Sequence, residues 1–143
     1  MADCDNDGNT GSLRTDLRMR LKGMSLKNKK IVLRFMSEFI KGNNDSYIDY
    51  LTDDIKWNIV GMPSIKGKSN FLQAMEMMEL WQSSLKDKNI SIEYIKNIVA
   101  ESEFVVVESA GKNNNSCNCD IYKIKDGKIQ ELTTYIVDTS LNE

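Results

Sequence analysis

The stretch Ile121-Tyr-Lys-Ile-Lys-Asp-Gly-Lys-Ile129 carries the clearest structural signal in the chain. Its Asp126-Gly127 pair is favoured in two-residue turns between antiparallel strands, because such turns require a positive φ at both positions. Apolar and charged residues alternate before the turn, which is typical of a strand with one buried face. The stretch therefore predicts a β-hairpin whose strands cover residues 117–125 and 129–137.

More strands are predicted on the N-terminal side of the hairpin. Residues 104–110 form a nearly continuous apolar run, as expected for a central strand. A shorter alternation begins at Ile90, so that the C-terminal part reads as an antiparallel meander of four strands. Residues 55–60 predict one earlier strand, and Gly61–Gly67 predicts a loop after it. On one face of that earlier strand the pattern places Ile55, Trp57 and Ile59.

Helical patterns occupy the rest of the chain. Ser25 is suited to cap a helix with apolar residues four apart that ends near Gly42. A short helix is predicted over residues 45–51, and Ser69 is suited to start a third that runs to about residue 85. Helices, one strand, a helix and then a meander together indicate an α+β domain, with about three helices on one face of a sheet.

The first 23 residues differ from the remainder. Asp, Asn and Gly dominate their beginning, and residues 12–22 then place three leucines among basic residues. We interpret residues 1–23 as a flexible leader or tag-like segment and residues 24–143 as the domain. A short basic amphipathic helix that contacts a membrane surface or a partner stays open as the alternative.

Composition restricts the classes of function. The chain has 143 residues, a formal net charge of −2 and no histidine. Its basic residues are dispersed, so we expect no nucleic-acid partner. No apolar run approaches the roughly 20 residues that cross a bilayer, and no secretory signal is recognisable, so we expect no membrane partner and a cytoplasmic location.

The lack of histidine also excludes Ser-His-Asp and Cys-His catalysis. Cys117 and Cys119 form a Cys-x-Cys pair, but a zinc site needs four ligands and Cys4 is the one other thiol. We therefore expect no metal and no cofactor.

Several segments, taken in order, resemble the nuclear transport factor 2-like superfamily and within it the SnoaL-like domains. They are Asp53-Asp-Ile-Lys-Trp-Asn-Ile-Val-Gly61, Gly67-Lys-Ser-Asn-Phe71, the hairpin stretch quoted above, and Glu131 and Tyr135 after it. The resemblance covers residues 25–139. It implies a cone-shaped roll with a curved, mainly antiparallel sheet, an apolar pocket between sheet and helices, and a homodimer formed through the outer sheet face. Because the superfamily contains isomerases, cyclases, epoxide hydrolases and binding modules, fold alone selects no function.

The known catalytic sets of the superfamily are incomplete in this sequence. Ketosteroid isomerases use a tyrosine, an aspartate base and a protonated aspartic acid. An ungapped match places Phe35 at the tyrosine and Ile59 at the base, whereas Asp120 falls near the aspartic acid. For the Asp-Arg-Asp set of limonene-type epoxide hydrolases, Thr134 replaces the last aspartate. A cyclase of the SnoaL type needs one pocket carboxylate, which Asp120 could supply.

Strand parity supports a special position for Asp120. Lys123 and Lys125 face one side of their strand, so Asn118, Asp120 and Tyr122 face the other, apolar side. A carboxyl group there loses hydration, which raises its pKa and suits it to proton transfer or hydrogen bonding. The alternative is a bend that leaves Asp120 in water or beside a lysine.

Two functions remain open. The first is a non-catalytic module that binds a small apolar ligand, and the second is a small acid–base enzyme of the cyclase or isomerase type that uses Asp120. The predicted pocket combines aromatic, aliphatic and polar side chains, all of which core packing also explains: Phe35, Phe39, Trp57, Ile59, Phe71, Met75, Met78, Asn118, Tyr122 and Tyr135.

Overall fold

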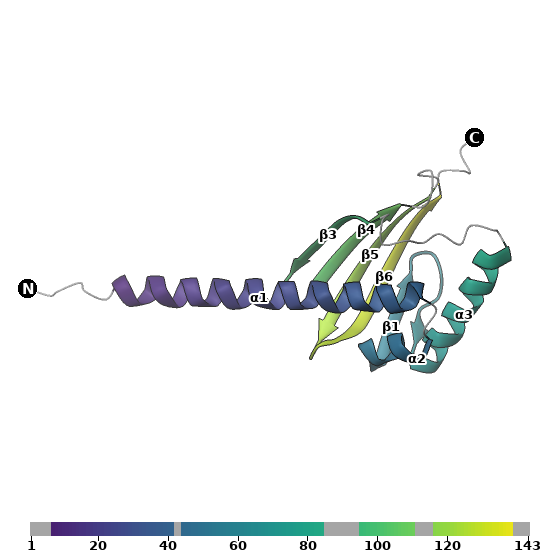
Figure 1. Cartoon of the computed structure of the whole chain (residues 1–143), viewed down its shortest axis with the longest axis horizontal. Coiled ribbons are helices and arrows are strands. Elements are labelled where there is room, and N and C mark those ends of the chain that lie inside the picture. Colours follow the sequence, from purple (N-terminus) through teal and green to yellow (C-terminus); the bar gives the residue numbers. More distant parts are fainter. Residues whose placement is uncertain (1–6, 42–43, 85–94, 111–115, 139–143) are drawn as a thin grey trace, which may run out of the picture.

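The computed structural model describes residues 7–41, 44–84, 95–110 and 116–138 (Figure 1). Three α-helices, a short 3-10 helix and six strands follow one another in the described residues. The helices are α1 (Asp7–Ile40), α2 (Asn44–Tyr47) and α3 (Lys68–Ser84), with a 3-10 helix over Ile48–Tyr50. The strands are β1 (Leu51–Ile59), β2 (Ile65–Lys66), β3 (Ile95–Glu101), β4 (Phe104–Ala110), β5 (Ser116–Lys125) and β6 (Lys128–Asp138).

The six strands form one curved mixed sheet in the order β2-β1-β6-β5-β4-β3 (Figure 1). The pair β1–β6 is parallel and all other pairs are antiparallel, so the predicted mainly antiparallel α+β architecture is confirmed. The predicted hairpin turn is also confirmed, because Asp126 has φ 50° and Gly127 has φ 78°.

Three details differ from the prediction. Strand β1 begins at Leu51, the last residue of the predicted 45–51 helix and four residues before the predicted strand start. Strand β2 lies inside the expected 61–67 loop, and the first meander strand is β3, whereas the alternation that begins at Ile90 lies outside the described residues.

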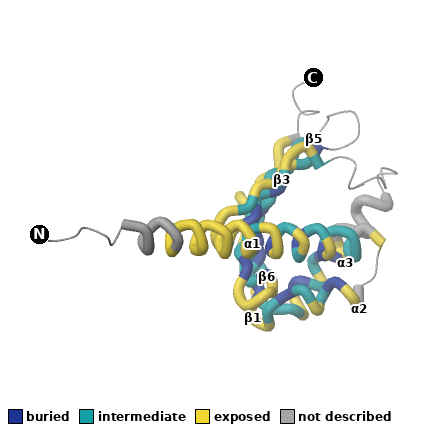
Figure 2. The backbone as a smooth tube through the Cα atoms, turned by 60° about the vertical axis from the view of Figure 1, so that its left-hand side comes forward, coloured by how far each residue is buried: buried dark blue, intermediate teal, exposed yellow. Residues whose placement is uncertain are grey.

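Helix α1 is much longer than predicted. It runs without interruption from Asp7 to Ile40, so the prediction that Ser25 starts the helix was wrong. Ser25 lies in its middle, where the last residues of the N-terminal segment continue directly into the part that packs on the sheet (Figure 1). The boundary at residue 24 stays a prediction for the domain, but it is not a boundary of secondary structure. Residues 13–24 are all exposed (Figure 2).

Aromatic side chains fill the space between helices and sheet. Phe71 of α3 lies with its ring centroid 5.2 Å from Trp57, 6.4 Å from Phe35 and 6.5 Å from Tyr47. Phe35 also meets Tyr122 of β5, at 6.1 Å and an interplanar angle of 71°. Edge-to-face pairs of this kind add to the free energy gained by burying the rings. The cluster therefore joins all three helices to β1 and β5.

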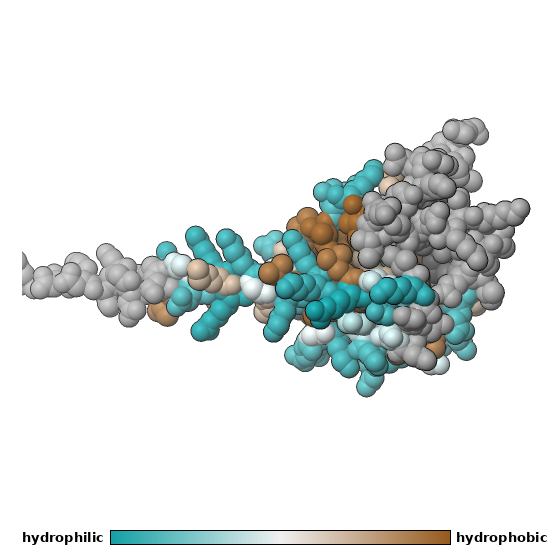
Figure 3. Space-filling model, in the orientation of Figure 1, coloured by the Kyte–Doolittle hydropathy of each residue, from teal (hydrophilic) through white to brown (hydrophobic). Residues whose placement is uncertain are grey.

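One polar contact fixes α1 to the far hairpin of the meander. Asn28 is 7% exposed, and its Nδ2 donates a 3.1 Å hydrogen bond to the carbonyl oxygen of Ser102. Ser102 lies in the β3–β4 turn and has φ 55°, an uncommon conformation for a residue other than glycine. Beside α1, hydrophobic residues gather over β3 and β4 (Figure 3). In the described part of the chain, no helix is both long and apolar enough to cross a membrane.

Candidate functional site

Asp120 lies in the middle of β5, between Val107 of β4 and Thr134 of β6. The same row continues to Ile59 of β1, which pairs with Thr134. On one side of this row Tyr122 is buried in the aromatic cluster. On the other side Asn118 is half-buried. Asp120, itself half-buried, therefore lies at the border of the apolar core, on the sheet face that carries the helices.

A directed chain of hydrogen bonds holds the Asp120 carboxyl group. Trp57 Nε1 donates to Thr134 Oγ1 at 2.9 Å, and Thr134 Oγ1 donates to Asp120 Oδ1 at 2.7 Å. The indole N–H is a donor only, so it occupies a lone pair of the Thr134 oxygen and leaves the hydroxyl proton for Asp120. Among the described residues, Thr134 bonds to Oδ1 of Asp120, and the other carboxyl oxygen, Oδ2, is left for a ligand.

Two effects act in opposite directions on this carboxyl group. Burial removes hydration from the carboxylate and raises the pKa of Asp120 to about 6, whereas the hydrogen bond from Thr134 lowers it. Burial also raises the pKa of Tyr122 well above its usual value, and the nearby Asp120 charge adds to that rise. Tyr122 therefore stays a neutral phenol, and Asp120 changes charge near neutral pH.

Most predicted site residues lie, like Asp120, on the side of the sheet that the helices cover. Five of them are buried: Phe35, Trp57, Phe71, Met75 and Tyr122. Phe39, Ile59 and Asn118 are half-buried. The side chain of Met78 lies outside the described residues. These residues pack as a hydrophobic core. That they also line a ligand pocket stays a prediction.

Tyr135 does not join this group. It is 45% exposed, and it pairs with Cys119, so it lies on the sheet face opposite to Asp120. The cause is a register shift in the hairpin: Ile124 pairs with Ile129, but Lys123 pairs with Glu131, which leaves Gln130 as an extra residue. A bulge of this kind reverses the faces of all later residues in the strand. Alternation counted from Ile129 would have placed Tyr135 inside, and the bulge turns it outward.

The same bulge creates the contact that sequence reasoning missed. Without it Asp120 would lie opposite Thr133, and with it Asp120 lies opposite Thr134. Thr134, which in the sequence stands at the place of a catalytic aspartate, is in the structure the residue that orients Asp120. Trp57, expected as a pocket residue, is the donor that orients Thr134. Strict alternation would place Ile129 and Leu132 on opposite faces of the strand, but both are apolar and both are buried. This break in alternation is the signal in the sequence that could have indicated the bulge.

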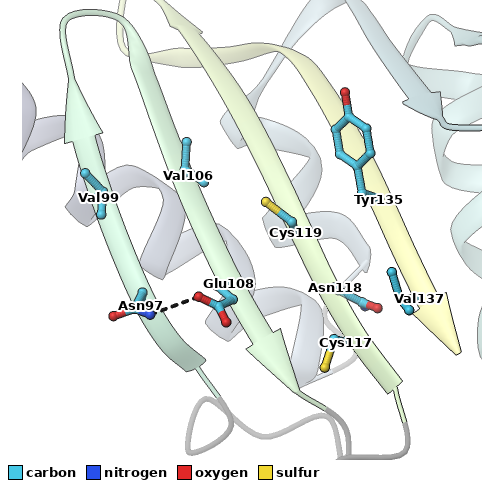
Figure 4. A pocket seen from close by; sticks show the side chains of 9 residues that line it. All are labelled: Asn97, Val99, Val106, Glu108, Cys117, Asn118, Cys119, Tyr135 and Val137. Carbon is cyan, nitrogen blue, oxygen red and sulfur yellow. Dashed lines mark hydrogen bonds between the residues drawn. The ribbon is translucent and has the colours of Figure 1, made fainter. Parts of the chain in front are cut away.

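The described pockets lie on the outer face of the sheet. The larger has a volume of about 500 Å³, and Figure 4 looks onto it from the side opposite to the helices. Neither it nor the smaller pocket beside it, of about 330 Å³, includes Asp120. The larger one is lined by Asn97, Val99, Val106, Glu108, Cys117, Asn118, Cys119, Tyr135 and Val137.

Cys117 and Cys119 both lie at this outer pocket as free thiols (Figure 4). Within the described ranges, no group of three or more His, Cys, Asp or Glu side chains is arranged to hold a metal ion. The pair therefore has no set of further ligands among these residues.

No family model and no curated protein matches the chain. Solved structures do match. A nuclear transport factor 2-like protein from Burkholderia xenovorans is 18% identical over 81% of this chain and 92% of its own, with a TM-score of 0.58.

Two other solved structures carry names that refer to enzymes. A ketosteroid isomerase candidate from Kribbella flavida is 10% identical over 80% of each chain, with a TM-score of 0.62. An LEH-like epoxide hydrolase from M. tuberculosis is 17% identical over 80% of this chain and 85% of its own, with a TM-score of 0.60. At these identities the likeness concerns the fold alone. The curved sheet, its strand order and the helices on one face give this chain the nuclear transport factor 2-like fold.

Proposed function

We propose that the domain binds a small, mainly apolar molecule on the helix-bearing side of the sheet, with a polar group of that molecule at Asp120. The observation that carries the proposal is the oriented carboxyl group at the border of an aromatic core. Small-molecule sites typically combine an apolar lining with a few fixed polar groups. Here the aromatic cluster would supply the lining and Asp120 Oδ2 the polar contact.

The protonation state of Asp120 defines which polar groups fit. Because Oδ1 accepts the hydrogen bond of Thr134, the proton of the neutral acid is placed on Oδ2. Below its pKa of about 6, Asp120 can therefore donate to a ligand carbonyl oxygen, and above it the carboxylate accepts from a hydroxyl or ammonium group. We expect affinity for carbonyl ligands to fall as the pH rises through 6.

A ligand screen by thermal shift tests the proposal. The wild type is screened with steroids, aromatic ketones and polyketide-like phenols at pH 5 and pH 8, next to Asp120→Asn and Asp49→Asn. Asp49 is exposed in the 3-10 helix before β1, so its variant controls for loss of a negative charge. We expect to find a ligand that stabilises the wild type. Its affinity should change at least tenfold in Asp120→Asn and should stay the same in Asp49→Asn. Equal affinities in all three proteins would exclude Asp120 from the site.

A second candidate function is acid–base catalysis by Asp120. The observation that favours it is the pKa of about 6, because a proton-transfer group works best when its pKa lies near the working pH. Asp120→Asn would then lose turnover at least about 100-fold while it still binds the ligand. Retained turnover in this variant would contradict catalysis by Asp120, and binding without turnover in the wild type would favour the binding module.

A further inference from the structure

The N-terminal part of α1 concentrates positive charge. Residues 13–30 carry seven basic side chains against the single acid Asp16, whereas the rest of the chain carries twelve basic and twenty acidic side chains. A formal charge of +6 on this segment therefore stands against −8 on the remainder. Among the described residues, the ion pairs involve none of the seven, so their charge is available to an anionic partner. The seven are Arg14, Arg18, Arg20, Lys22, Lys27, Lys29 and Lys30.

This segment is also open to solvent. Residues 13–24, which we call the α1 extension, are all exposed and project past the β3 edge of the sheet (Figure 1). Of the seven basic residues, Lys29 is half-buried and the other six are exposed. Figure 3 shows hydrophilic side chains along α1 on the side that is turned away from the sheet.

A line of apolar side chains runs along that same side of α1. Asn28 and Phe35 face the sheet, because they are 7% and 3% exposed. Leu26 and Leu33 each precede one of them by two residues, and at about 100° per residue this turns their side chains to the opposite side of the helix. Met19 lies two turns before Leu26, on the same line. Met19 is 66% exposed, Leu26 is 55% exposed and Leu33 is half-buried.

Lysines flank this apolar line on both sides. Lys22 and Lys29 follow Met19 and Leu26 by three residues, which places them on one side of the line, and Lys30 follows Leu26 by four, on the other side. A lysine in such a place can lay its methylene chain along an apolar surface and hold its ammonium group at a polar boundary. We call this surface the outward face of α1; it comprises Met19, Lys22, Leu26, Lys29, Lys30 and Leu33.

We propose that the outward face of α1 lies on an anionic phospholipid surface. The apolar line enters the boundary between headgroups and acyl chains, and the lysines contact the anionic headgroups. Met19 and Lys22 lie in the α1 extension, so a flat surface reaches the helix there without meeting the sheet (Figure 1). The contact differs from our expectation of no membrane partner, because a helix that lies along a lipid surface needs no run long enough to cross a bilayer.

The apolar residues favour lipid over nucleic acid as the partner. A nucleic acid would attract the lysines through its phosphates, but it would leave Met19 and Leu26 in water. The boundary of an anionic bilayer takes up the apolar side chains and the lysines together. It can also take up four further apolar residues of the extension, which are between 45 and 63% exposed: Leu13, Leu17, Leu21 and Met24.

Flotation of the full chain with vesicles tests the contact. The vesicles contain phosphatidylcholine alone or phosphatidylcholine mixed with phosphatidylserine. We expect binding to the mixed vesicles to be at least about tenfold tighter and to weaken as the salt concentration rises. Equal binding to both kinds of vesicle, or binding to neither, would overturn the proposal.

A matched pair of charge reversals locates the contact on the chain. One variant combines Lys22→Glu with Lys30→Glu, and its control combines Lys66→Glu with Lys128→Glu; all four lysines are exposed. We expect the first variant to bind the mixed vesicles at least about tenfold more weakly and the control to bind like the wild type. Equal losses in the two variants would mean that the vesicles respond to overall charge, and they would contradict the assignment to α1.

A second pair of variants separates lipid from nucleic acid without a change of charge. Met19→Gln with Leu26→Gln removes the apolar line, and Met62→Gln with Met77→Gln is the control, because those residues are 64% and 72% exposed. We expect vesicle binding to fall about tenfold in the first variant only. All these proteins are also titrated with a short double-stranded RNA. RNA binding that is tighter than vesicle binding and unchanged by Met19→Gln with Leu26→Gln would make the outward face a nucleic-acid surface and overturn the proposal.

Discussion

At the scale of single residues, the hydrogen-bond chain Trp57–Thr134–Asp120 determines what this site can do. The chain has one direction, because it begins at an obligatory donor and ends at a carboxyl oxygen. It favours the carboxylate, but burial favours the neutral acid by more, and the pKa of Asp120 rises to about 6. The pKa of Asp120 should therefore change when either its burial or its hydrogen bond with Thr134 is altered.

The raised pKa of Asp120 predicts a specific dependence of stability on pH. Its folded pKa of about 6 lies above the reference value of 3.8, so the native state binds the proton more tightly than the unfolded state. The contribution of Asp120 is therefore fully present below about pH 4 and is lost as the pH rises through 6. A shift of this size corresponds to at most about 3 kcal/mol.

Asp120→Asn, which stays neutral, should remove this dependence. We expect the variant to gain stability relative to the wild type between pH 4 and pH 8, by about 1–3 kcal/mol. Urea unfolding at both pH values measures it. A constant difference between the two proteins at all pH values would show that Asp120 titrates normally.

Thr134 offers a matched pair of substitutions. Thr134→Val keeps the shape but removes the hydroxyl, so the pKa of Asp120 should rise further and Trp57 Nε1 should lose its acceptor. We expect a loss of about 1–3 kcal/mol in stability from the unpaired buried donor. Thr134→Ser keeps the hydroxyl and should change neither quantity much. Carboxyl NMR titration reports the pKa, and equal pKa values in the two variants would contradict the role of Thr134.

At the scale of elements, α1 and the hairpins depend on a few residues that hold one element to another. Asn28 connects α1 to the β3–β4 turn across 74 positions of sequence. Gln130, the extra residue of the β5–β6 hairpin, sets which side chains of β6 face the helices. Both are polar residues in otherwise periodic patterns, and each changes the geometry of a neighbouring element.

Loss of the Asn28 contact should loosen the β3–β4 turn. Asn28→Ala removes the donor and leaves the carbonyl group of Ser102 without this partner, so we expect a loss of about 1–3 kcal/mol. Asn70→Ala serves as the control, because Asn70 makes a comparable 2.9 Å bond to a carbonyl at an exposed position. Hydrogen exchange of the β3–β4 amides should accelerate in the first variant only. Equal exchange in both variants would mean that the turn is held by other contacts.

At the scale of the whole molecule, one aromatic cluster joins the helices to the sheet. Phe71 lies at its centre, 1% exposed and in contact with rings from α1, α2 and β1. The cluster keeps the helix-bearing face apolar up to the row of Asp120. The outer face also carries apolar side chains, Val99 and Val137 among them, but these are exposed in the described part of the chain.

Phe71→Ala should therefore destabilise the whole fold. Removal of a fully buried phenyl ring typically costs about 3–5 kcal/mol. Met77→Ala on the same helix is the control, because Met77 is 72% exposed and its loss should stay within about 0.5 kcal/mol. Thermal unfolding of both variants separates the two cases. A small effect of Phe71→Ala would mean that the aromatic cluster is not the centre of the core.

The sequence by itself determined the α+β class, the Asp126-Gly127 hairpin, the meander and the apolar face that contains Asp120, because these depend on local turn chemistry and on periodicity of two. It did not determine the full length of α1, because a serine such as Ser25 is favoured at a helix start but costs only about 0.5 kcal/mol inside a helix. The bulge at Gln130 was also hidden, since one unpaired residue leaves the composition of the strand unchanged while it reverses every later side chain. Only the tertiary structure therefore decided that Thr134 faces Asp120 and that Tyr135 faces outward.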